Sequence, residues 1–287
     1  MTPTPLERIT WDAPSAPVGH LTVLRPIPSY PVDAVGPIVF LDHFGPIPTP
    51  SDKLPAHPHA GIEVMTYLLE GANEHTDSLG NTGRTHAGGA QWMKSGRGIL
   101  HTERFLPDEA PTTHGLQIWA RLPIENQDDA PEYRAIQASD VPRWSRDGSE
   151  LRLLSGALEG HQGPIPLALV SLMVHVSVEP GASTEVVLPE SSHEYAVYGI
   201  TAEGDVQVDG AEALSRGTTV RLESGATSVR LDNHGAERAE VFLFGGEPAP
   251  RPLFFGGPFV LNTKSGLVEA QRRFSAGEMG TLDGVPR

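Results

Sequence analysis

The chain has 287 residues, among them 31 Gly and 27 Pro, and its formal net charge is −15 at pH 7. This length predicts two domains, and the Gly and Pro content is typical of a turn-rich all-β chain. The negative charge argues against direct nucleic-acid binding, and the lack of Cys excludes disulfides and thiolate metal sites. No apolar run long enough to span a membrane and no secretory signal is visible, so we expect a cytoplasmic protein without a membrane partner.

Short apolar runs separated by Pro and Gly predict strands at 20–24 and 37–41. His43 follows the second run, and we expect it to be a structural hydrogen-bonding residue rather than part of a site. A further strand is predicted at 114–122. The acidic, turn-rich stretch 123–131 then predicts a connection between domains, with a short helix as an option.

Four potential metal ligands recur at strand spacing in two segments. His57 and His59 are two residues apart, and His101 and Glu103 repeat this spacing. Side chains at i and i+2 of a strand share a face, so two adjacent strands aim three imidazoles and one carboxylate into one space. This predicts one divalent metal ion per chain. Fe(II) is the first expectation, with Mn, Ni, Co, Cu or Zn as alternatives, because a set of ligands encodes the metal only weakly.

Several neighbours of these ligands also allow a prediction. If one strand runs through 57–67, Glu63 shares the face of His57 and His59. His75 and His86 flank the Gly80 turn, and we expect both to be exposed to solvent. Trp92 and Met93 are expected to pack in the core.

The second half repeats the strand pattern without the ligands. Glu203-Gly204 echoes Glu70-Gly71, which indicates an internal duplication of the architecture. His193 and His234 each lack a second ligand at strand spacing, so no metal is expected in this half. A helix is predicted at 268–274. The predicted strands are 151–154, 167–178, 184–188, 195–200, 206–210, 217–222 and 239–244.

Several motifs together resemble the pirin family of the cupin superfamily. The resemblance rests on His57-Pro58-His59, 61–63, 67–71, 77–81, 91–93, 96–103, 114–119 and 256–263. It implies two tandem, jelly-roll-like cupin β-barrels with few short helices: a metal-binding domain at 1–135 and a metal-free domain at 136–287. It also implies that Glu103 is the fourth ligand, so Glu63 is expected beside the ligands, where it orients an imidazole N–H.

The resemblance implies a metal-dependent dioxygenase that opens the ring of flavonols such as quercetin. The expected partners are a small aromatic, flavonol-like substrate and O2, and Glu103 is the candidate catalytic base for the substrate hydroxyl. The alternative is an iron-dependent regulatory protein that binds a transcriptional or metabolic partner without turnover. A third interpretation is a barrel that the metal merely stabilises. An open route to the metal would favour the enzyme.

Overall fold

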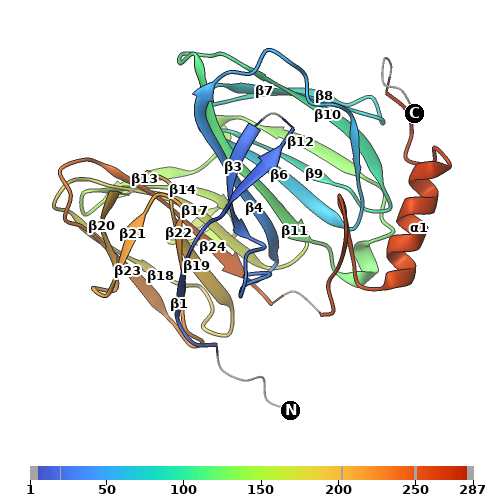
Figure 1. The fold of residues 1–287 in the computed structure, drawn as a ribbon. Helices are drawn as coiled ribbons and strands as arrows, with labels where there is room; N and C mark the ends of the chain where they lie inside the picture. Colours follow the sequence, from blue (N-terminus) through green and yellow to red (C-terminus); the bar gives the residue numbers. More distant parts are fainter. Residues whose placement is uncertain (1–5, 20, 202, 249–250, 283–287) are drawn as a thin grey trace. The chain divides into compact units, whose positions relative to one another are not determined.

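The computed structural model (Figure 1) describes residues 6–19, 21–201, 203–248 and 251–282. Contacts between Cα atoms divide the chain into two compact units, each built from two separate segments. We call Phe44–Asp140 together with Ala249–Arg287 the histidine unit. Met1–His43 together with Val141–Pro248 is the apolar unit.

The histidine unit contains two antiparallel sheets that position the candidate ligands. One has the strand order β5-β10-β7-β8. The other has the order β12-β9-β6-β11 and continues with β4, the strand in which the boundary between the units falls. The bounds are β4 Ile38–Pro48, β5 His57–His59, β6 Ile62–Glu70, β7 Ala72–Asp77, β8 Thr82–His86, β9 Ala90–Lys94, β10 Ile99–Leu106, β11 Thr112–Arg121 and β12 Glu132–Ile136.

The apolar unit is also built from sheets, in the orders β1-β22-β19-β24-β17-β14-β13 and β18-β23-β20-β21. Strands β2 and β3 pair with each other, and β3 pairs with the first half of β4. The bounds are β1 Ile9–Asp12, β2 Ser15–Val18, β3 Leu21–Ile27, β13 Arg143–Arg146, β14 Ser149–Ser155, β15 Ala157–Leu158, β16 His161–Gln162, β17 Ser171–Val178, β18 Ser183–Val187, β19 Glu194–Gly199, β20 Glu203–Val208, β21 Glu212–Ser215, β22 Thr218–Arg221, β23 Ser228–Asn233 and β24 Ala239–Gly246.

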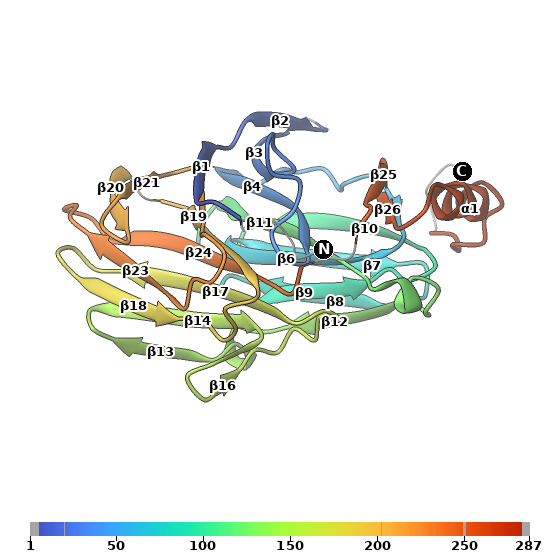
Figure 2. The ribbon, with the colours of Figure 1, turned by 90° about the horizontal axis from the view of Figure 1, so that it is seen from below.

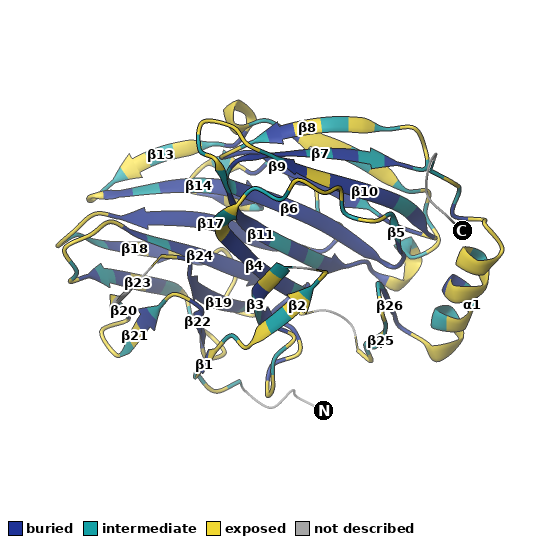
Figure 3. Ribbon diagram, turned by 45° about the horizontal axis from the view of Figure 1, so that its top comes forward, coloured by how far each residue is buried: buried dark blue, intermediate teal, exposed yellow. Residues whose placement is uncertain are grey.

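Burial follows the strand pattern. Every residue of β17 is buried, and β6 is buried over most of its length (Figure 3), so both faces of these strands are covered. Strand β18 instead alternates between buried and exposed positions, as a strand with one covered face does. The β20–β21 hairpin turns through Asp209-Gly210-Ala211, and Asp209 and Gly210 have positive φ, a conformation that Asp and Gly tolerate in turns.

The predicted C-terminal helix is confirmed as α1 (Lys264–Ser275), and Figure 2 views it nearly along its axis beside β25 (Phe254–Gly256) and β26 (Phe259–Leu261). The Thr263 side chain accepts a hydrogen bond from Gly266 N and so caps the N-terminus of the helix. The helix buries Ala270 against an apolar cluster that includes β26. None of the helices in the described part of the chain is long and apolar enough to cross a bilayer.

The region predicted as one strand over 57–67 is two strands in different sheets, which corrects the sequence analysis. Gly61 lies between them with φ of +78°, and a Cβ at this position would meet the Val260 carbonyl oxygen at 2.3 Å. The chain therefore turns from β5 into β6 at a residue that must be Gly. The alternation of side chains in β5 therefore does not predict which face of β6 Glu63 occupies.

The connection after β11 contains two short 3-10 helices, Ile124–Asn126 and Ala138–Asp140. Between them, β12 pairs with β9 up to Ile136. The division into domains 1–135 and 136–287 stays a prediction, since each compact unit combines an internal segment with one end of the chain.

Candidate metal centre

Strands β5 and β10 lie side by side and bring the predicted histidines together. In their antiparallel register His57 is opposite His101, and His59 is opposite Ile99. The possible ligand nitrogens of His57, His59 and His101 all lie within 4.8 Å of one another. In the described part of the chain, this is the one such group of His, Cys, Asp or Glu side chains.

Two of the three imidazoles are held by backbone carbonyls. His57 Nδ1 lies 2.9 Å from the carbonyl oxygen of Pro55, and His59 Nδ1 lies 3.2 Å from that of Pro258. Because a carbonyl oxygen only accepts, each Nδ1 carries the proton and each Nε2 presents its lone pair. The Pro258 carbonyl comes from the late segment 256–263 that contributed to the family resemblance.

The protonated forms of the buried histidines are disfavoured. Burial, and then the neighbouring His57, lower the pKa of His59 well below its ordinary value, although the hydrogen bond to Pro258 opposes this. Burial, and then His57, His59 and His75, lower the pKa of His101 in the same way. Both side chains are therefore neutral at pH 7, which is the form that binds a metal.

The donor set fits a divalent transition metal. His57 Nε2 and His101 Nε2 are 3.0 Å apart. Two imidazole nitrogens at ordinary metal–nitrogen distances and a right angle are separated by about 3.0 Å. Imidazoles are ligands of borderline softness and suit Fe, Ni, Cu or Zn. His57 is half-buried while His59 and His101 are buried, so His57 is the member of the cluster that reaches the solvent.

Glu103 is buried two residues beyond His101 on β10, although it lies outside the group of three. Its Oε1 accepts hydrogen bonds from Thr66 Oγ1 (3.1 Å), Asn73 Nδ2 (2.9 Å) and Gln91 Nε2. Three donors on one oxygen suit a carboxylate and hold it in one orientation. The assignment of Glu103 as the fourth ligand stays a prediction.

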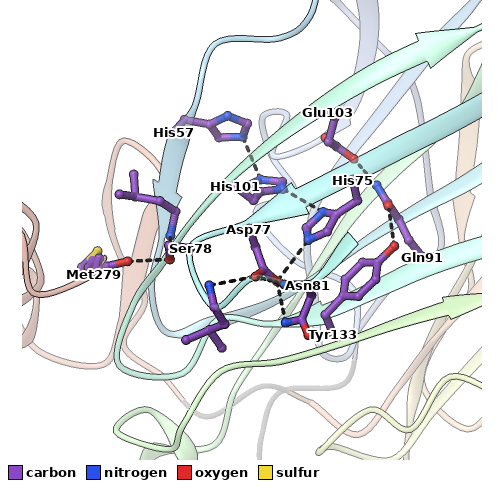
Figure 4. A network of polar contacts seen from close by, with 12 residues as sticks. His57, His75, Asp77, Ser78, Asn81, Gln91, His101, Glu103, Tyr133 and Met279 are labelled. Carbon is purple, nitrogen blue, oxygen red and sulfur yellow. Dashed lines mark hydrogen bonds and ion pairs between the residues drawn. The ribbon is translucent and has the colours of Figure 1, made fainter. Parts of the chain in front are cut away.

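His75 is buried, and the prediction that it is exposed is wrong. Strand β7 places His75 opposite Glu103 and Asp77 opposite His101, so all four side chains share one face of the sheet. His101 Nδ1 is 3.5 Å from His75 Nδ1, and His75 Nε2 is 3.2 Å from Asp77 Oδ2 (Figure 4). The spacing of His75 and Asp77 repeats that of His57 and His59, and this signal could have revealed them. His86 is partly exposed.

Asp77 anchors the far end of this chain of polar contacts. Burial tends to raise the pKa of Asp77, but hydrogen bonds from His75, Asn81 and the Leu79 amide outweigh it and lower the pKa below the usual value. Asn81 Nδ2 donates to Asp77 Oδ2 at 2.9 Å. The charged carboxylate thus orients His75, and His75 in turn contacts His101.

Tyr133 connects the two sides of the network (Figure 4). Its ring stacks on His75 with centroids 4.0 Å apart, and its hydroxyl donates to Gln91 Oε1 at 3.4 Å. Burial, and then the charges of Glu103 and Asp77, raise the pKa of Tyr133, so it remains a donor at neutral pH. Gln91 also donates to Glu103. Glu103 and His101 are therefore connected through Gln91, Tyr133 and His75.

Glu63 faces away from this network, so the prediction that it shares the face of the histidines is wrong. The pairing of β6 with β11 places Thr66 opposite Gln117, on the side where Thr66 reaches Glu103. Glu63 is three residues before Thr66 and therefore lies on the other face. There its Oε1 accepts from Trp92 Nε1 at 3.1 Å. Trp92 and Met93 are buried, as predicted.

The remaining histidines of the sequence analysis lie in the apolar unit. His43 Nδ1 is 2.7 Å from the Tyr198 hydroxyl, and this hydrogen bond confirms the expected structural role. His193 Nδ1 lies 3.4 Å from the Tyr195 hydroxyl, and His234 is exposed.

The fold and the site define a class of protein: two cupin domains in tandem, one of which has a histidine cluster between its sheets. The chain belongs to the pirin family. The family model described as Pirin matches residues 21–120, and the model of the Pirin C-terminal cupin domain matches residues 173–280. A pirin-like protein from Caulobacter vibrioides is 33% identical over 284 residues, which are 96% of this chain and 95% of that protein.

Solved structures share the fold. A crystal structure named quercetin 2,3-dioxygenase from Acinetobacter baumannii has a TM-score of 0.88 and 27% identity, covering 98% of this chain and 93% of that one. The bacterial pirin YhhW from Escherichia coli, in complex with nickel(II), has a TM-score of 0.64 and 19% identity, covering 84% of this chain and 100% of that one.

Proposed function

We propose that this chain is a metal-dependent dioxygenase that opens the ring of a flavonol-type substrate with O2. The observation that carries the proposal is the convergence of three imidazoles, two of them buried and neutral, on one space in the histidine unit. Likeness over nearly the whole chain to a structure named quercetin 2,3-dioxygenase supports the reaction class.

In this proposal His57, His59 and His101 hold the metal through nitrogen, and Glu103 holds it through its carboxylate. Fe(II) is the proposed metal, and the nickel(II) complex of YhhW supports a metal in this fold rather than its identity here. A metal held there would supply Lewis-acid chemistry toward O2 and an anionic oxygen of the substrate.

The chain's own residues set the geometry and move the proton. The carbonyl oxygens of Pro55 and Pro258 fix the rings of His57 and His59. Glu103, oriented by Asn73 and its other donors, accepts the proton of the substrate hydroxyl. The half-buried His57 marks the side from which the substrate enters.

The test is turnover normalised to metal. Protein loaded anaerobically with Fe(II) is mixed with quercetin, O2 is admitted, and loss of the flavonol absorbance is followed together with carbon monoxide release. We expect one carbon monoxide per flavonol consumed, and we expect the His193→Ala variant to behave as the wild type. No turnover with Fe, Mn, Ni, Co or Cu contradicts the proposal and favours a regulatory protein without turnover.

A further inference from the structure

Arg121, the last residue of β11, is a buried cation without a visible partner. Its side chain is 0% exposed, and Nε and both terminal guanidinium nitrogens have no hydrogen-bond partner among the described residues. A guanidinium has five N–H donors. Proteins nearly always pair a buried charge, because an isolated one is strongly destabilising. The arrangement therefore lacks an acceptor.

The face of β11 that bears Arg121 is the face of the candidate metal centre. Gln117, Trp119 and Arg121 alternate along the strand and so point to the same side. Gln117 Oε1 lies 3.0 Å from Thr66 Oγ1, the hydroxyl that donates to Glu103. The Trp119 ring lies 5.0 Å from the ring of His59. Arg121 is therefore one same-face position, about 7 Å along the strand, beyond a residue that contacts a proposed ligand.

The charged neighbour that affects the pKa of Arg121 is also a cation. Burial, and then the cation of Arg251, lower the pKa of Arg121 to about 10, and no carboxylate of the described residues counteracts this shift. At pH 7 the side chain is still almost entirely charged. Arg251 is exposed, so the Arg121 guanidinium lies within electrostatic reach of a surface residue.

We propose that Arg121 binds a carboxylate of the substrate, and that the natural substrate of the proposed dioxygenase is a flavonol-like aromatic or enolic acid that carries a carboxylate. The metal-binding oxygen of such a molecule lies beside the histidines, and its carboxylate receives the planar fork of Arg121. Because Arg121 has no solvent-accessible surface, binding requires its side chain or its neighbours to move. The reaction in this inference rests on the proposed function, whereas the binding of a carboxylate rests on Arg121 alone.

Stability provides the first test, since an unpaired buried cation and a structural arginine respond in opposite ways to removal. Arg121→Met keeps much of the side-chain volume and removes the charge. In buffer without carboxylates or phosphate, we expect a melting temperature equal to or above that of the wild type. Exposed Arg104 supplies the matched control, Arg104→Met. A clear fall for Arg121→Met alone means that Arg121 is paired in solution and overturns the proposal.

Binding provides the second test, on metal-free protein so that no ligation contributes. Benzoate, its neutral analogue benzamide, and inorganic phosphate are each titrated, with calorimetry and the shift in melting temperature as readouts. We expect benzoate to bind wild type, Arg104→Met and, more weakly, Arg121→Lys, while Arg121→Met binds at least about tenfold more weakly. Equal binding of benzamide, unchanged binding by Arg121→Met, or binding of phosphate alone overturns the proposal, and phosphate alone indicates a site for free anions.

The two proposals can fail separately. Arg121-dependent benzoate binding in a protein that turns over no flavonol rejects the dioxygenase and leaves the anion site. Turnover of quercetin with the same kcat/KM in wild type and Arg121→Met, together with no benzoate binding, leaves the dioxygenase and rejects the anion site.

Discussion

In the histidine unit, strands β5, β7 and β10 turn His57, His75 and His101 toward one another. In the apolar unit, strands such as β17 and β24 fill the space between the sheets with Val, Leu and other apolar side chains, for example Val174 and Leu243. Each unit is built from antiparallel sheets, so the architecture by itself does not decide whether an interior holds polar, potentially reactive side chains or apolar ones. The residues at alternate positions of a few strands decide it.

The two interiors also differ in how their side chains affect the stability of the fold. Each buried polar group of the histidine unit needs a partner, and the contacts from Asp77 through His75 to His101 supply several of them. Each buried aliphatic side chain of the apolar unit instead contributes about 1.5–3 kcal/mol of transfer free energy. We therefore expect substitutions in the first interior to affect metal and activity, and substitutions in the second to affect stability.

The largest effect should follow the loss of a proposed ligand. His101→Ala should reduce the metal content from about one per chain to near zero, because three converging nitrogens become two. Elemental analysis of protein purified under identical conditions measures this. His193→Ala, in the apolar unit, is the control and should retain the metal. Equal metal in both variants, or close to two metals per wild-type chain, would contradict the contrast between the interiors.

Glu103→Gln should lower turnover per bound metal by about 10²- to 10⁴-fold, the usual range for loss of a general base. Glu63→Gln should have a much smaller effect, since Glu63 faces Trp92 on the other side of the sheet. Both variants are compared with wild type by flavonol loss divided by metal content. Full activity per metal in Glu103→Gln rejects the role as base, and a decrease proportional to metal content indicates a ligand only.

Leu243→Ala in the apolar unit should decrease the free energy of unfolding by about 2–5 kcal/mol, because it leaves a cavity where a fully buried side chain stood. The metal content per folded chain should not change. Denaturant unfolding monitored with metal analysis of the native fraction checks both. A loss of metal without a loss of stability would show that the two interiors are not independent.

His75→Gln should weaken metal affinity by about 10- to 100-fold, the usual cost of removing a group that orients a ligating histidine. His86→Gln is the matched control, a partly exposed histidine on the neighbouring strand. Competition with a metal chelator measures the affinity of each. An unchanged affinity in His75→Gln means that the contact with His101 is incidental.

The smallest effect concerns the metal-free protein at mildly acidic pH. His59 and His101 have pKa values below the unfolded value of about 6.5, so acid protonates the unfolded chain first and the fold loses stability as pH falls. Two such residues predict a loss of at most about 1.4 kcal/mol between pH 7 and pH 6. Denaturant melts at the two pH values measure it, and the loss should disappear in a His59→Ala, His101→Ala double variant.

Strand geometry was sufficient to predict that His57 and His59 share a face. Their meeting with His101 depended on the assumption that the two segments pair, as β5 and β10 do. The pattern failed at Gly61, where a tertiary contact with the Val260 carbonyl forces a turn that alternation cannot reveal. Glu63 was misplaced for this reason.

Burial was harder to predict than spacing. His75 looked like a polar residue before a turn, and only the pairing of β7 with β10 shows that it lies behind His101. Arg121 carried no signal in the sequence, since a terminal arginine on a strand normally reaches solvent. Strand order and register depend on long-range pairing, and one sequence does not contain that information in readable form.

The hydrogen bond between His59 and the Pro258 carbonyl links the metal centre to the order in which the chain is synthesised. All four proposed ligands have been made once residue 103 is added, yet the group that orients His59 arrives about 150 residues later, or roughly 10–30 s at ordinary translation rates. During this interval the nascent chain offers histidines without a finished site. We therefore expect the site with His59 oriented only in the completed chain.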